Sequence, residues 1–112
     1  MAIFQFAAPI LPGKLDQWKA FNREIQGPRK AAMDALQQQA GVTRQVASLQ
    51  QTPMGDFAVV MIEGDDPSAF MKAMAQATDE FGKWFKGQVQ DIHGMDLEGP
   101  PPSIEVYYTY PS

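Results

Sequence analysis

The stretch FAVVMIE at residues 57–63 decides the fold class of this chain. It is short, continuously apolar, and rich in β-branched and aromatic side chains, which is typical of a β-strand. Successive side chains of a strand point to opposite faces of the sheet. The two faces carry these residues: Ala58, Val60 and Ile62 on one, and Phe57, Val59 and Met61 on the other. Both faces of the predicted strand are therefore apolar.

Three further strands are predicted around this one. Residues 42–51 precede it across the turn TPMGD at residues 52–56, and this short link with Pro and Gly predicts a β-hairpin. The apolar stretch AIFQFAA at residues 2–8 predicts a first strand. The stretch SIEVYYTY at residues 103–110 predicts a last strand, because β-branched and aromatic residues dominate it.

Helical spacing of apolar residues predicts the remaining elements. One long pattern starts at Lys14 and stops at Gly41, and Gly27-Pro28 inside it predicts a kink or a split into two helices. We expect a helix to start at the acidic pair before Pro67. A further helix is expected between Thr78, its predicted cap, and Gly94.

The predicted order is β-α-β-β-α-β, with an extra helix before the last strand. This order is the ferredoxin-like arrangement of an α+β fold, in which helices cover one face of a four-stranded antiparallel sheet. An extended linker, GPPP at residues 99–102, precedes the last strand. The length of 112 residues fits a single ferredoxin-like domain over residues 1–112.

The two apolar faces of the sheet predict a homodimer. A sheet covered by helices on one face usually presents polar residues on the other. Here the second face is apolar as well, so a second copy of the sheet is the simplest cover. The alternative is that the extra helix folds over this face within one chain.

Composition restricts the classes of partner and cofactor. The formal net charge is −4 and no basic run is present, so nucleic acid is not an expected partner. The chain has no cysteine, which excludes disulfides and thiolate ligands and fits a cytoplasmic location. No basic segment precedes the apolar residues at the N-terminus, so we expect no signal peptide, and no apolar run is long enough to span a membrane.

The chain resembles the dimeric α+β barrel superfamily in its predicted strand order, its FAVVMIEGDDP segment at residues 57–67, and the aromatic pair at Trp84. Within that superfamily it is similar to a small uncharacterised bacterial group with an HG-x-D-L element, here at residues 93–97. The superfamily includes cofactor-free monooxygenases, haem-binding enzymes, isomerases and members without known activity. The resemblance therefore implies a dimer but selects no function.

His93 and Asp96 are the candidate catalytic residues. His93 is the only histidine and could serve as a general acid or base near neutral pH. Asp96 lies three residues later and could hydrogen-bond it. The alternative is that His93 only interacts with the carbonyl groups at the end of its helix. A single histidine supports neither a metal site nor haem, so no metal and no cofactor are expected.

Arg29, Asn22 and Trp84 are the candidate substrate-binding residues. In a continuous helix, Asn22 and Arg29 share one inward arc with Trp18 and Ile25. A buried guanidinium needs an anion, and a substrate carboxylate would supply it. The alternative is that Gly27-Pro28 resets the helical register and turns Arg29 toward solvent.

A haem-binding relative that uses His93 is permitted by the lone histidine but has no other support, and two functions fit these candidates better. The first is a small cofactor-independent enzyme acting on a hydrophobic or aromatic acid between sheet and helices, with His93 as acid or base and Arg29 as the carboxylate anchor. The second is a non-catalytic dimeric module that binds a small molecule or a protein.

Overall fold

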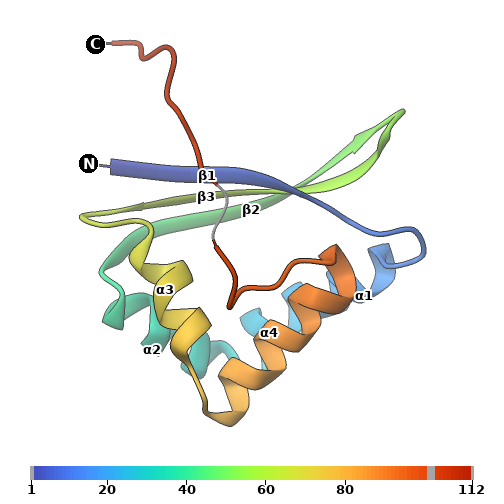
Figure 1. The fold of residues 1–112 in the computed structure, drawn as a ribbon. Coiled ribbons are helices and arrows are strands. Elements are labelled where there is room, and N and C mark those ends of the chain that lie inside the picture. The colour runs from blue at the N-terminus through green and yellow to red at the C-terminus, as the bar shows by residue number, and fades with distance from the viewer. Residues whose placement is uncertain (1, 101–102, 112) are drawn as a thin grey trace.

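The computed structural model describes residues 2–100 and 103–111. Within this part the chain is α+β, with four helices and a three-stranded antiparallel sheet of order β1-β3-β2. The elements are β1 (Ala2–Pro9), α1 (Leu15–Gln26), α2 (Lys30–Gln39), β2 (Val42–Thr52), β3 (Gly55–Gly64), α3 (Ala69–Gln76) and α4 (Glu80–His93). All four helices lie on one side of the sheet (Figure 1).

The hairpin of β2 and β3 is confirmed, and its turn is held by a threonine. The Thr52 hydroxyl donates to the Gly55 carbonyl at 2.8 Å and accepts from the Met54 amide at 3.1 Å. Gly55 has φ +129°, a backbone conformation that side-chain-bearing residues rarely adopt. The β1 strand pairs with β3 from Ala2↔Gly64 to Pro9↔Phe57, which makes β3 the central strand.

The long helical pattern is split, as Gly27-Pro28 predicts. The α1 helix ends at Gln26 and α2 begins at Lys30. Asn22 and Arg29 therefore do not belong to one continuous helix. The shared inward arc expected for them is wrong, and each side chain has its own surroundings.

The starts of the last two helices differ from the prediction. The α3 helix begins at Ala69, after Ser68, and the side chains of the acidic pair before Pro67 do not cap it. The cap of α4 is Asp79 rather than Thr78, since its side chain accepts from the Gly82 amide at 2.9 Å. Gly94 ends α4 in the left-handed conformation, as predicted.

The core lies between the inner face of the sheet and the helices. Its largest fully buried side chains are Ile62 of β3, Phe70 and Met74 of α3, and Ile92 of α4. Phe85 brings rings from two other helices together: it contacts Phe21 at 5.1 Å between centroids and Phe70 at 6.3 Å. No helix of the described residues is both long and apolar enough to cross a bilayer.

The predicted last strand is wrong, and with it the four-stranded ferredoxin-like order. Residues 103–110 form no strand, and they extend away from the body on the side of the sheet opposite the helices (Figure 1). Their composition fits a pleated, half-buried surface, but such a preference does not supply a neighbouring strand. The structure describes only positions 99 and 100 of the linker predicted at 99–102, and the rest of the linker lies outside the described residues.

The face of the sheet opposite the helices has no cover from the part of the chain described. The extra helix does not fold over it, because α3 and α4 both lie on the same side as α1 and α2 (Figure 1). Ile3 of β1 is 47% exposed on this face, and Val46 of β2 is 37% exposed.

Candidate functional site

An apolar cavity of about 80 Å³ lies between the inner face of the sheet and the helices. Aromatic side chains from several elements line it, including Phe6, Trp18, Phe21 and Phe85. Most of the wall is apolar, and the polar side chains in it are these three: Asn22 of α1, Gln45 of β2 and His93 of α4. No lysine, arginine or carboxylate lines the cavity within the described residues. It can therefore hold an apolar group but offers no countercharge to an ion.

The structure fixes the tautomer of His93. Its Nδ1 atom lies 2.8 Å from the Pro9 carbonyl oxygen, which can only accept, so Nδ1 carries the proton and donates it. The neighbouring Leu11 amide donates to the Ile92 carbonyl at 2.9 Å, which holds the end of α4 against the exit of β1. Burial lowers the pKa of His93 below its ordinary value of 6.5, and the hydrogen bond to Pro9 opposes that shift. His93 is therefore neutral near pH 7, with a lone pair on Nε2.

Asn22 and Gln45 add two further acceptor atoms to the cavity wall. The Asn22 side-chain nitrogen donates to the Trp18 carbonyl at 2.9 Å, which leaves its oxygen and its second N–H group for other partners. The Gln45 Oε1 atom is buried and has no hydrogen-bond partner among the described residues. A buried acceptor without a donor is costly and is uncommon in folded proteins. The cavity thus combines apolar walls with acceptors that a bound donor would satisfy.

Arg29 lies outside this cavity and is already paired. Its guanidinium donates to both carboxylate oxygens of Glu80, at 2.9 and 2.8 Å, and to Glu24 at 3.3 Å. It also stacks over the Trp84 ring, 4.3 Å from the centroid. The hydrogen bond to Glu80 is the main cause that raises the pKa of Arg29. The reason for expecting a substrate anion was an unpaired buried guanidinium, and that condition is not met.

Trp84 contacts Arg29 on one side and the aromatic rings of the core on the other. Its ring stacks on Phe21 at 5.4 Å between centroids and lies 6.0 Å from Phe81. Trp84 is not among the residues that line the cavity. Within the candidate substrate-binding set, only Asn22 lines the cavity with His93.

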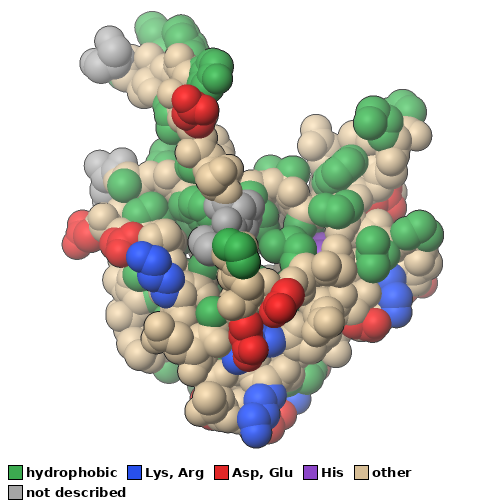
Figure 2. All heavy atoms as spheres, in the orientation of Figure 1, with side chains coloured by type: hydrophobic (Ala, Val, Ile, Leu, Met, Phe, Trp, Pro, Cys, Tyr) green, Lys and Arg blue, Asp and Glu red, His purple; other side chains and the backbone are tan. Residues whose placement is uncertain are grey.

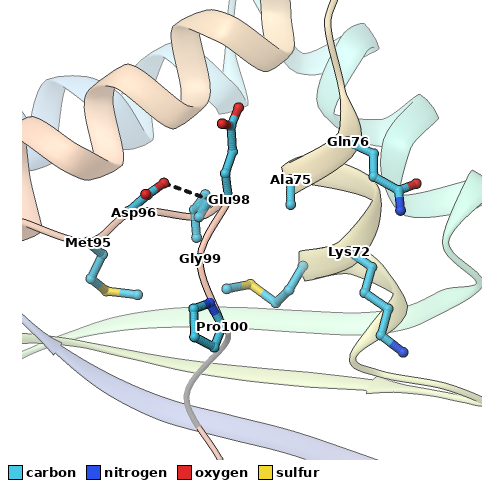
Figure 3. Close-up of a pocket in the computed structure, with 10 residues that line it drawn as sticks. Lys72, Ala75, Gln76, Met95, Asp96, Glu98, Gly99 and Pro100 are labelled. Carbon is cyan, nitrogen blue, oxygen red and sulfur yellow. Dashed lines mark hydrogen bonds between the residues drawn. The ribbon is translucent and has the colours of Figure 1, made fainter.

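Asp96 does not pair with His93; it shapes the chain after α4. Its Oδ1 atom accepts from the Glu98 amide at 2.9 Å, and its backbone carbonyl accepts from the Gly99 amide at 3.1 Å. It lines a second, open groove of about 400 Å³ between α3 and residues 95–100 (Figure 3). The candidate catalytic residues therefore belong to two different sites.

The cavity and the groove share a wall. Met71 of α3 lines both, and so do Met95 and Leu97 of the segment after α4. Lys86 anchors this segment, because its ammonium group donates to Glu98 at 2.9 Å and to the Ala77 carbonyl at 2.8 Å. Methionine side chains adapt their shape easily, so Met71 and Met95 allow this wall to adjust.

Gln45 is the site residue that sequence reasoning missed. It lies opposite Ile62 on the inner face, on the same side of β2 as Ala47 and Leu49, because the pairing of β2 with β3 is regular from Arg44 to Thr52. The available signal was its alternation with the apolar residues Ala47 and Leu49, which points all three side chains to one face.

No group of three or more metal-ligating side chains occurs in residues 2–100 and 103–111. Comparisons with protein-family profiles, with curated proteins and with solved structures find no match to this chain.

Proposed function

We propose that the protein binds a small, uncharged, largely apolar molecule that carries a hydroxyl or another hydrogen-bond donor. The observation that carries this proposal is the apolar cavity in whose wall the buried Gln45 Oε1 atom has no donor among the described residues and the His93 Nε2 atom carries a lone pair. A phenol or a small alcohol matches that wall, because its ring or chain fills the apolar part and its hydroxyl supplies the missing donor.

The proposed ligand is uncharged because the cavity offers no cation. The hypothesis of an acidic substrate depended on Arg29, whose guanidinium pairs with Glu24 and Glu80. A carboxylate in the cavity would instead meet the neutral imidazole of His93 and two amide groups. Burial of an unpaired carboxylate is strongly unfavourable.

The cavity volume restricts the size of the ligand. Drug-sized ligands occupy pockets of about 300–1,000 Å³, whereas this cavity measures about 80 Å³. As it stands it accepts a molecule of only a few heavy atoms, and a ring such as that of phenol requires Met71, Met95 and Leu97 to move apart and join the cavity to the groove.

A matched set of probes tests this proposal. We expect phenol to raise the melting temperature more than toluene does, and benzoate to have no effect. At about a hundred times Kd, phenol should stabilise the native state by about 2.7 kcal/mol. His93→Gln and Gln45→Leu should reduce the effect of phenol, whereas Asp96→Asn, in the groove, should leave it unchanged. Equal shifts from phenol and toluene in all variants would refute the proposed polar recognition.

A second candidate function is proton transfer by His93. The specific observation is that the neutral imidazole donates its Nδ1 proton to the Pro9 carbonyl. The Nε2 atom is therefore free to accept a proton. The Nε2 atom would take a proton from carbon beside a carbonyl, giving an enolate and an imidazolium, and would return it in the next step. Deuterium exchange at that carbon in a small phenolic ketone, followed by NMR, distinguishes the functions. Exchange that His93→Gln abolishes indicates an enzyme, and binding without exchange indicates a binding module.

A further inference from the structure

An open pocket of about 490 Å³ lies beside β2, where residues of α1 and α2 approach this strand. Most of the polar side chains that line it are amides, and these are Asn22 and Gln26 of α1, Gln37 of α2 and Gln45 of β2. Its two charged side chains, Lys30 and Asp34, form an ion pair with each other. Within the described residues, the pocket therefore offers polar groups but no unpaired charge.

The unmet need of this pocket is for hydrogen-bond donors. Gln37 and Gln45 each have a buried Oε1 atom that has no hydrogen-bond partner among the described residues. A buried acceptor without a donor is costly. The two residues come from α2 and β2, which pack against each other, and both line the pocket. The last torsion of a glutamine side chain is soft, so a donor placed in the pocket can satisfy both oxygens.

The strand β2 adds backbone groups to the same pocket. Gln45, Val46 and Ala47 all line it. Side chains of a strand alternate between two faces, so three successive residues meet one pocket where it follows the edge of the strand. β2 is an outer strand in the order β1-β3-β2, and an edge strand presents N–H and C=O groups without a strand neighbour. A ligand group that both donates and accepts hydrogen bonds fits this edge.

The pocket adjoins the apolar cavity between the sheet and the helices. The two share part of their walls, namely Asn22, Ile25, Met33, Gln45 and Ala47. Ala47 is exposed although it lies on the inner face with Gln45, so the helices leave β2 uncovered at this point. One molecule can therefore place a polar head in the pocket and an apolar tail in the cavity.

We propose that this pocket binds the head group of a short-chain primary amide, whose alkyl chain enters the cavity. Such binding rests on the proposed function, because the cavity must accept the apolar chain. The two N–H bonds of the head satisfy Gln37 and Gln45, and its carbonyl oxygen accepts from the edge of β2. The head is uncharged, because the carboxylate of Asp34 is already paired with Lys30. A thin alkyl chain also suits a cavity of about 80 Å³ better than a ring does.

A small polar head fits this pocket better than a protein partner does. The most exposed large apolar side chains of the described residues are those of Met54, Tyr107, Tyr108 and Tyr110. They lie on the hairpin turn and on the C-terminal segment 103–110, where Figure 2 shows hydrophobic side chains. None of them lines the pocket. The pocket is thus set apart from the surfaces on which apolar contacts with another protein are expected.

Titration of the full chain with matched amides tests the head group. The probes are butanamide and N,N-dimethylbutanamide, which share the butanoyl group but differ in their N–H donors. We expect butanamide to bind about tenfold more tightly in an NMR titration, because it alone supplies the donors that the buried oxygens lack. Equal dissociation constants, in a protein that still binds phenol, would overturn the amide site and leave the proposed function standing. If neither phenol nor butanamide binds, both fail.

The variant Gln37→Leu separates hydrogen bonding from ligand size, because Gln37 lines the pocket but not the cavity. We expect it to weaken butanamide binding about tenfold and to leave the binding of N,N-dimethylbutanamide and phenol unchanged. It removes a buried acceptor that has no donor, so its melting temperature should not fall below that of wild type. Gln38→Leu, at the neighbouring exposed position of α2, is the matched control and should change no binding. Unchanged butanamide binding in Gln37→Leu would overturn the site.

Discussion

The two faces of β3 differ in burial although both are apolar. Ala58 and Ile62 are buried under the helices, whereas Val59 and Met61, at alternate positions, remain partly exposed. The difference lies in the cover that each face receives and not in the chemistry of its side chains. An apolar pattern therefore identifies surfaces that need a partner, but it does not identify where the partner comes from.

Removing one side chain from each face gives the largest expected contrast. Ile62→Ala should lower the free energy of unfolding by about 2–5 kcal/mol, because it leaves a cavity among fully buried neighbours. Met61→Ala should cost about 0.5 kcal/mol or less in dilute protein, where its face is uncovered. Urea denaturation at two protein concentrations measures both. Equal losses at low concentration would contradict the difference between the faces.

Gly64 tests how closely the inner side is packed. A Cβ atom at this position would lie 2.7 Å from the Gly41 carbonyl oxygen, and backbone atoms cannot move away easily. Gly64→Ala should therefore cost about 1–3 kcal/mol.

The matched change on the outer side is Glu63→Ala, which removes only the long contact with Arg44. It should alter the free energy of unfolding by about 0.5 kcal/mol or less. If Glu63→Ala were the more damaging change in thermal denaturation, the assignment of the two faces would be wrong.

His93 makes the inner side sensitive to pH. Its pKa is lower in the folded chain than the ordinary 6.5, so the unfolded chain binds the proton more tightly. The stability that neutral His93 contributes is complete above about pH 6.5, and it is lost as the pH falls through the lower folded-state pKa. Wild type should therefore lose more stability than His93→Gln between pH 7.5 and pH 5 (about the range in which histidine titrates). Carboxylates titrate in both proteins, so their effect cancels; parallel curves would show that His93 is not desolvated.

Arg29 should give a smaller effect than Gly64, since its ion pairs lie at a partly exposed margin away from both faces. Arg29→Met should lower the melting temperature less than Gly64→Ala does, and the difference from wild type should shrink as salt is added. Phenol binding should be unchanged. A variant that loses phenol binding would show that Arg29 contributes to the cavity after all.

Elements set by local patterns could be predicted from the sequence. The hairpin followed from its turn, and the division of the long helical pattern followed from Gly27-Pro28, because proline and glycine act on the backbone where they stand. The last strand could not be predicted reliably, because residues 103–110 carry strand-forming side chains and yet find no neighbour within the chain. Pairing depends on distant segments, which local composition does not report.

The candidate site was predictable only in part. His93 and Asn22 do line one cavity, but Arg29 shares the arc of Asn22 only if the helix is continuous, and it is not. Its partners Glu24 and Glu80 come from different helices, so the ion pairs depend on tertiary packing. Gln45 could have been assigned to the inner face from its alternation with Ala47 and Leu49, but its lack of a hydrogen-bond partner depends on tertiary packing.

The position of β3 between its neighbours also sets an order of events during synthesis. β2 and β3 are adjacent in sequence, so their hairpin can close as soon as residue 64 has left the ribosome. β1 is made before β3 but pairs only with β3, from Ala2↔Gly64 onward. Its aromatic side chains therefore stay unpaired until β3 has been synthesised. Closing such a long loop slows folding. We expect β1 to need protection until β3 has been made, and a circular permutant opened between β1 and α1, which makes β1 after β3, should remove that need.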